Sequence, residues 1–280
     1  MRKKLLLAIA LFYSVGILSA QTFRPSAEKL YQSLIDDVYI FAVFVDTQDD
    51  YWEEEEKEYY YQQLLRSQAW LVEQASLYGQ YLNFENDYFL DNREHVYLED
   101  VRRGQSPKYT VNQALKEIGY DDFDDFLYRN SFDFENNKLK MVFFVKKYDR
   151  SHAYNYFSNK DLDLAIVYCR STIGLITNHF VISHEILHQF GAWDLYYGKS
   201  QTRETAQKAK ELYPNSIMIN TRNNLAELEV DDLTAWRIGW HYDYQEEYDE
   251  FDPNKRTKED KKEAGGTSFK FDLKGKKGKQ

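Results

Sequence analysis

The sequence predicts an α/β fold in which a mixed sheet is covered by helices. Apolar runs of strand length alternate with longer segments whose apolar residues recur at helical spacing. The chain has 280 residues, 43% of them hydrophobic, with 24 tyrosines and 18 phenylalanines, so it can bury a substantial core. No internal repeat or proline-rich linker divides it. We therefore expect one large α/β domain.

The first two predicted elements are a buried strand and a long helix. Residues 38–45 are mostly β-branched or aromatic, which favours a strand. Glutamates at 53–56 open the helix, where the helix dipole stabilises negative charge, and apolar residues then recur at helical spacing up to Tyr78. We expect Gly79 to end this helix.

The middle of the chain predicts strands and short helices. Aromatic and polar residues alternate from 81 to 101, which favours one or two strands. Short surface helices are expected at 111–118 and 123–128. Clearer strands follow at 140–147 and 163–170, where the residues are largely apolar. These elements complete the mixed sheet.

The next predicted helix carries the most informative residues. Asn178 is a candidate N-cap for a helix over 179–190. His184 and His188 are four residues apart, so they project from one face of that helix and can bind one metal ion. Glu185 lies beside them, where a carboxylate can take a proton from a metal-bound water. This spacing is typical of zinc hydrolases.

The residues after the helix strengthen the prediction of a metal site. Gly191 can adopt a left-handed conformation and end the helix, so that the chain turns back. Three residues further on, Asp194 can return to the same metal as a third ligand and leave one position open for water. The sequence therefore predicts a Zn²⁺ site formed by His184, His188 and Asp194, with Glu185 as the catalytic base.

These residues resemble a known family. The pattern His-Glu-x-x-His-x-x-Gly-x-x-Asp at 184–194 resembles that of the metzincin zinc peptidases, and specifically of the snapalysin-type branch, in which aspartate replaces the usual third histidine. The resemblance is close for 181–196, weaker for 214–218 and only architectural elsewhere. It implies a metzincin-like catalytic domain, with a mixed twisted sheet, a long backing helix and an active-site helix.

The resemblance also implies roles for further residues. Met218 would lie in a tight turn beneath the metal, formed by residues 214–218. Tyr196 would stabilise the oxyanion of the tetrahedral intermediate, with Tyr197 as its alternative. The substrate peptide would add as a strand to an edge strand at 163–170, although the apolar content of these residues also fits an interior strand.

A second ligand scheme stays open. Residues 227–231 fit the Glu-x-x-x-Asp pattern of thermolysin-type zinc peptidases, in which Glu227 would bind zinc and Asp231 would orient a histidine. This scheme leaves Gly191 and Asp194 unexplained. A structural alternative is one helix that packs beneath the site, ends at Gly239 and buries Leu225, Leu228, Leu233, Trp236 and Trp240.

The two ends of the chain predict export and a basic tail. Residues 1–20 have a basic start, an apolar run and small residues before Gln21, as in a signal peptide. With a single cysteine, which cannot form an internal disulfide, this predicts a secreted or periplasmic protein of bacterial type. Residues 255–280 carry ten Lys or Arg against four acids and are expected to form a flexible tail.

The charge of the remaining body argues against nucleic acid as a partner. The formal charge of the chain is −10, the tail contributes +6 and the signal peptide +3, so residues 21–254 carry −10 − 6 − 3 = −19. With this negative charge, residues 21–254 repel the phosphate groups of nucleic acids. We expect a peptide or protein substrate, no nucleic acid, no stable membrane insertion after signal removal, and a monomer.

Together these features predict a secreted zinc-dependent metalloendopeptidase. It would hydrolyse peptide bonds by a zinc-activated water, with Glu185 as general base. Three alternatives stay open: a zinc amidase acting on cell-wall peptides, a thermolysin-like site with Glu227 as third ligand, and a non-catalytic binding protein on the same scaffold.

Overall fold

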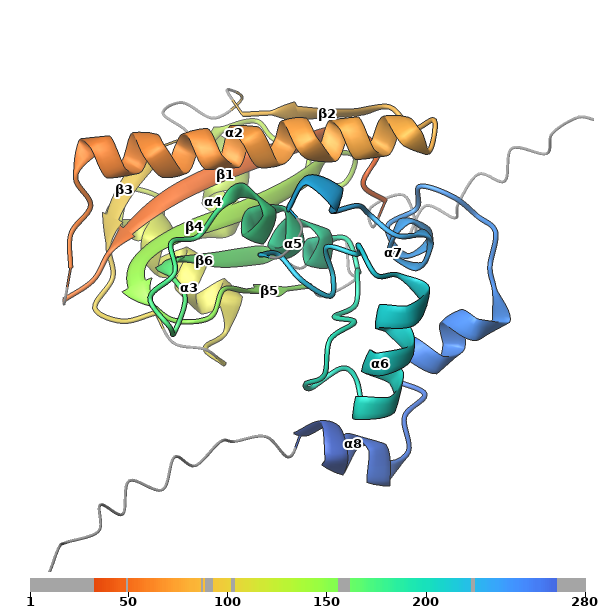
Figure 1. Cartoon of the computed structure of the whole chain (residues 1–280). Coiled ribbons are helices and arrows are strands. Elements are labelled where there is room, and N and C mark those ends of the chain that lie inside the picture. The colour runs from red at the N-terminus through yellow and green to blue at the C-terminus, as the bar shows by residue number, and fades with distance from the viewer. Residues whose placement is uncertain are drawn as a thin grey trace, which may run out of the picture.

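The structure is a computed structural model that describes residues 33–48, 50–86, 88, 93–101, 104–155, 162–222 and 225–265. The predicted signal peptide and residues 266–280 lie outside the described residues. Within them, a mostly parallel sheet lies between two layers of helices (Figure 1). The predicted mixed α/β class is confirmed. None of the helices in the described ranges is both long and apolar enough to cross a membrane.

The described part of the sheet has six strands in the order β2-β1-β4-β6-β5, and β3 also pairs with β1. The described pairs are parallel except that of β5 with β6. The central strands β1 and β4 are largely buried, as expected for strands covered on both faces. The bounds are Asp36–Asp46 (β1), Leu82–Glu85 (β2), Arg93–Tyr97 (β3), Lys138–Tyr148 (β4), His152–Tyr154 (β5) and Leu164–Arg170 (β6).

Helices cover both faces of the sheet. On one face lie the long helix α2 (Glu54–Leu77) and the shorter α5 (His179–Gln189), and on the other lie α3 (Pro107–Glu117) and α4 (Phe123–Arg129). Each face therefore has its own hydrophobic core. Alternate residues of β1 enter the two cores: Val38, Ile40, Ala42 and Phe44 the first, and Phe41, Val43 and Val45 the second.

Most predicted elements are confirmed, but the predicted edge strand is wrong. The strand expected at 163–170 is β6, which lies between β4 and β5. Its apolar residues reflect this interior position, because both of its faces are buried. The edge is formed instead by β5, a strand of three residues that was not predicted. Among the described residues no further strand pairs with its outer side.

The C-terminal region also differs from its prediction. The structural alternative of a single helix beneath the site is wrong, because the chain forms a short 3-10 helix, η1 (Leu225–Glu227), and a separate helix α7 (Asp232–Arg237). Between these two helices, Glu229 pairs with Ser216 in an isolated parallel β-bridge. The remaining elements are α6 (Arg203–Leu212), η2 (Glu246–Phe251) and α8 (Lys258–Gly265), the last within the predicted tail.

Candidate metal centre

The two ends of α5 are built as the sequence predicts. The side chain of Asn178 accepts a hydrogen bond from the backbone N–H of Val181 and so caps the first turn. Gly191 has a φ of +96°, in the left-handed region, and its N–H bonds to the carbonyl of His188 at 3.0 Å. The chain reverses there, which brings Asp194 back to the histidines at the end of the helix.

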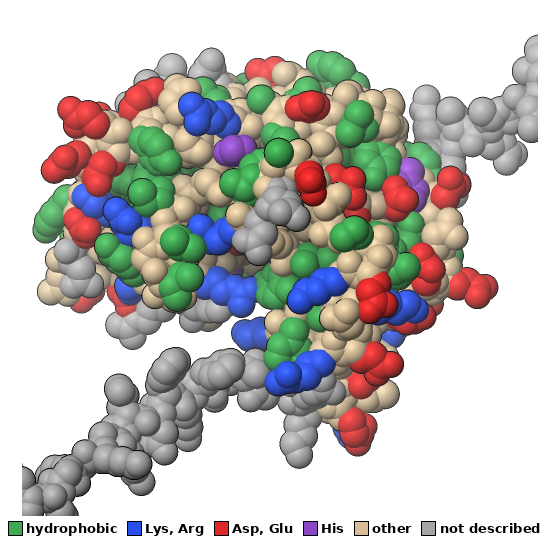
Figure 2. Space-filling model, in the orientation of Figure 1, with side chains coloured by type: hydrophobic (Ala, Val, Ile, Leu, Met, Phe, Trp, Pro, Cys, Tyr) green, Lys and Arg blue, Asp and Glu red, His purple; other side chains and the backbone are tan. Residues whose placement is uncertain are grey.

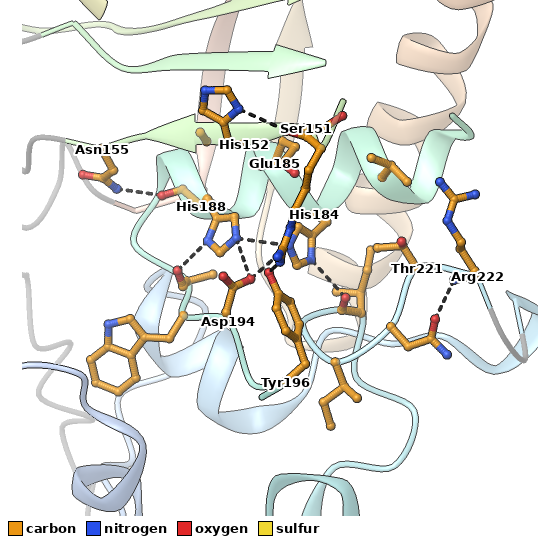
Figure 3. Close-up of a pocket in the computed structure, with 18 of the residues that line it drawn as sticks. Ser151, His152, Asn155, His184, Glu185, His188, Asp194, Tyr196, Thr221 and Arg222 are labelled. Carbon is orange, nitrogen blue, oxygen red and sulfur yellow. Dashed lines mark hydrogen bonds and ion pairs between the residues drawn. The ribbon is translucent and has the colours of Figure 1, made fainter. Parts of the chain in front are cut away.

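The three predicted ligands converge on one point (Figure 3). The Nε2 atoms of His184 and His188 are 3.1 Å apart. Oδ1 of Asp194 lies 3.2 Å from the first and 3.1 Å from the second. Ligand atoms at roughly 2.0–2.1 Å from a tetrahedral zinc ion are about 3.3 Å from one another. The three atoms are therefore spaced as ligands of a common metal ion.

Hydrogen bonds on the far side of each ring fix which nitrogen faces the centre. Nδ1 of His184 lies 3.1 Å from the carbonyl oxygen of Ile217, and Nδ1 of His188 lies 2.9 Å from that of Ala192. A carbonyl oxygen only accepts, so each Nδ1 carries the hydrogen and each Nε2 of a neutral ring presents a lone pair. Two such lone pairs and a carboxylate oxygen of Asp194 repel one another unless a cation lies between them. The donor set therefore fits a divalent metal.

The close approach of His184, His188 and Asp194 shifts the pKa values of their side chains. Burial lowers the pKa of His188, but the charges of Asp194 and Glu185 and the hydrogen bonds to Asp194 and Ala192 raise it to about 9. Burial raises the pKa of the Asp194 carboxyl, but His188 and His184 outweigh burial and hold it well below its usual range. Without a metal, a proton on His188 provides the positive charge, so a metal ion and a proton compete for this site.

Glu185 is placed as an available base. Its side chain is buried beside the histidines and lines the same cavity. Burial raises the pKa of its carboxyl. Its Oε2 has no hydrogen-bond partner among the described residues. A buried carboxylate oxygen without a partner costs folding free energy, which indicates a functional group rather than a structural one.

Of the two candidate tyrosines, Tyr196 lies at the site. Its ring stacks on that of His184 with centroids 6.3 Å apart, and its hydroxyl accepts a hydrogen bond from Arg150 (Figure 3). Tyr197 instead lies under the guanidinium of Arg203, at 4.8 Å. Arg150, in the turn between β4 and β5, was not predicted, because strand pairing and not sequence spacing brings it to the site.

The expected methionine turn borders the site. Met218 is fully buried, and its carbonyl accepts a hydrogen bond from the N–H of Leu195, next to Asp194. The preceding carbonyl, of Ile217, holds the ring of His184. This turn therefore positions two of the three ligands from one short segment.

The residues of the thermolysin-type scheme lie elsewhere. Glu227 is exposed in η1, and within the described ranges the group able to hold a metal consists of the two histidines and Asp194. Asp231 is buried and caps α7 by accepting from Thr234. It also accepts a hydrogen bond from Ser216 at 2.5 Å, so it anchors the methionine turn and not a histidine.

The metal centre opens into a cavity of about 710 Å³. Its lining includes residues of the edge strand β5 and the turn before it, and of the segment that follows Met218. Fold and site thus define a mixed α/β protein with a His-His-Asp group able to hold a metal ion. A scan of known protein families finds no match for the chain, and a search among curated proteins finds no relative. What the protein does must therefore follow from its own residues.

Proposed function

We propose that this chain is a metzincin-like zinc endopeptidase in which His184, His188 and Asp194 hold Zn²⁺. One observation carries the proposal: three lone pairs 3.1–3.2 Å apart converge beside the buried carboxylate of Glu185, whose Oε2 has no partner among the described residues. Two imidazoles and one carboxylate are a common donor set of hydrolytic zinc, and three protein ligands leave a position open.

The surrounding side chains have distinct roles in hydrolysis. Bound zinc would polarise the substrate carbonyl and lower the pKa of a water molecule toward about 7. Glu185 takes the proton of the attacking water and delivers it to the leaving nitrogen, so no nucleophilic side chain is needed. Arg150 donates to the hydroxyl oxygen of Tyr196, which leaves the hydroxyl hydrogen available for the developing oxyanion.

The edge of the sheet supports a peptide as the substrate. Strand β5 borders the cavity, with His152 and Ala153 among the lining residues. The outer backbone groups of an edge strand can pair with an extended peptide, which places its carbonyl groups along the cavity. The proposal includes export, since residues 1–20 have the composition of a signal peptide.

The substitution Glu185→Gln tests this function. We expect kcat/KM on a quenched peptide library to fall by about 10²- to 10⁴-fold, the usual contribution of a general base. The zinc content, measured by mass spectrometry of the purified protein, should stay at one ion per chain, because Glu185 is not a ligand. Wild-type protein that binds no zinc, or a variant as active as the wild type, would contradict the proposal. A parallel screen of cell-wall peptides separates an amidase from an endopeptidase.

A further inference from the structure

The cavity beside the candidate metal centre is lined by three arginines that form no ion pair with a described carboxylate. Arg150, Arg222 and Arg237 line it, and none forms an ion pair with a carboxylate within the described part of the chain. Yet residues 21–254 carry a formal charge of −19. On the face seen in Figure 2, Lys and Arg side chains gather below the centre, between β5 and α6, while acidic side chains lie mainly along the rim.

Four acidic residues also line the cavity: Glu185 and Asp194 belong to the candidate metal centre, and Asp149 and Asp252 each accept a backbone hydrogen bond through Oδ1. Asp149 accepts from the backbone N–H of Arg150 at 2.7 Å, and Asp252 accepts from that of Asn254 at 2.8 Å. Asp252 raises the pKa of the Arg237 guanidinium from a distance, against the larger lowering by burial. The guanidinium groups of the cavity donate to a hydroxyl or to backbone carbonyls, and none is in an ion pair with a carboxylate of the described residues.

The guanidinium of Arg237 is held by two contacts with the loop after α5. Its Nε donates to the carbonyl of Gly191 at 2.9 Å, and its guanidinium lies 4.1 Å above the ring of Trp193. These contacts fix the orientation of the guanidinium plane. Its two terminal nitrogens make no hydrogen bond to any described residue. A fixed guanidinium fork with free terminal nitrogens has the geometry that binds a carboxylate through two parallel hydrogen bonds.

Arg237 is attached to the loop that carries the third metal ligand. It contacts Gly191 and Trp193 of this loop. Ala192, whose carbonyl orients His188, lies between these two residues, and Asp194 follows them. A group bound at Arg237 is therefore next to the metal centre, within the reach of a substrate residue at or beside the bond that is cleaved.

We propose that the cavity selects peptides with a carboxylate beside the scissile bond, and that Arg237 binds this carboxylate. The inference rests on the proposed peptidase function. Arg150 and Arg222 line the same cavity, so with bound Zn²⁺ the formal charge of the lining is +3 + 2 − 4 = +1, which favours a carboxylate in an otherwise acidic protein. The carboxylate is either an Asp or Glu side chain of the peptide or its C-terminus, since both present the same two oxygens.

Binding without turnover tests this selection. Zinc-loaded full-length Glu185→Gln protein is titrated, by calorimetry, with two peptide pairs: internal Glu against Gln, and a free C-terminus against its amide. We expect the charged member of one pair to bind about tenfold more tightly, as for a charge-assisted bidentate contact. The pair that shows the difference identifies the source of the carboxylate.

Variants of Arg237 test whether this residue causes the preference for the charged peptide. Arg237→Gln keeps an amide that can donate to Gly191 and should abolish the preference, while Arg237→Lys keeps the charge without the planar fork and should retain part of it. The matched control Arg129→Gln removes the same charge from α4, on the opposite face of the sheet, and should leave the preference intact. Unchanged zinc content shows that each variant is folded.

The outcomes separate this inference from the peptidase proposal. No preference in either pair, or a preference that survives Arg237→Gln, overturns the role of Arg237. A preference that depends on Arg237, in a wild-type protein that cleaves no peptide, supports carboxylate selection and contradicts the peptidase function. Wild-type protein that cleaves both members of each pair, Glu against Gln and free C-terminus against amide, with equal kcat/KM overturns the selection and leaves the peptidase function standing.

Discussion

At the scale of single residues, a metal ion bound in the proposed site would exclude a proton from His188. Its pKa is raised to about 9 in the metal-free site, so at pH 7 the ring carries a proton that zinc must displace. We expect each zinc ion bound at pH 7 to release about one proton, and the affinity to rise about tenfold per pH unit from 6.5 to 8. Calorimetry in two buffers of different ionisation enthalpy measures the release. An affinity independent of pH would contradict the expectation.

Asp194 and Glu227 offer a matched pair of substitutions. Asp194→Asn removes the charge of the third ligand and should weaken zinc binding by about a hundredfold or more, since even outer-sphere changes cost 10- to 100-fold. Glu227→Gln removes the same charge from an exposed residue of η1 and should leave the affinity unchanged. Competition with a chelator of known affinity measures both. The reverse result would favour the thermolysin-type scheme.

The residues of the metal centre could be predicted because they are close in sequence. Helical spacing places His184, Glu185 and His188 together, and Gly191 explains how Asp194 returns. The cavity arginines could not be found in this way. They come from the turn after β4, from the segment after the methionine turn and from α7, and only the tertiary fold unites them.

At the scale of elements, local patterning predicts the long strands and helices, and pairing decides the rest. The strands at 38–45 and 140–147 and the helix over 179–190 are confirmed, because many residues contribute to each periodicity. Strand β5 has three residues, too few for a pattern. Its position at the edge of the sheet depends on the order of the strands, which the local sequence does not determine. The single helix considered as an alternative around 225–240 does not form, and Asp231 caps a separate helix there.

A buried ion pair holds the C-terminal end of α5 on the sheet. Nζ of Lys140 in β4 binds the carboxylate of Asp163 and lies 3.2 Å from the carbonyl oxygen of Gln189, the last residue of α5. Lys140→Met would remove the cation that faces the largely buried carboxylate of Asp163, so we expect the free energy of unfolding to fall by about 3 kcal/mol. Urea denaturation measures the change.

The control for this pair is an exposed one on the surface. Lys208 and Glu250 pair at 2.6 Å with both side chains largely in solvent. Lys208→Met should therefore change the free energy of unfolding by less than about 1 kcal/mol. The double variant Lys140→Met with Asp163→Asn removes both buried charges and should recover part of the loss. Equal effects of the two single variants would show that the buried pair does not stabilise α5.

At the scale of the whole molecule, the metal centre joins segments that are otherwise separate. The helix α5 packs on the sheet, while the methionine turn is tied through Asp231 to α7 and the C-terminal region. Ile217 and Leu195 connect that turn to His184 and to the loop of Asp194. A bound ion would therefore stabilise contacts on both sides of the cavity at once.

This linkage predicts how metal removal changes thermal stability. A ligand that binds only the folded state at a thousand times its Kd adds about 4 kcal/mol to the free energy of unfolding. For a domain of this size each kcal/mol shifts Tm by about 2–4 °C, so a chelator should lower Tm by about 8–16 °C. Calorimetric scans with zinc and with chelator measure this shift. Asp194→Asn protein should respond far less, because it lacks the third ligand. A wild-type Tm that is the same in both scans would mean that the three converging side chains do not bind a metal ion.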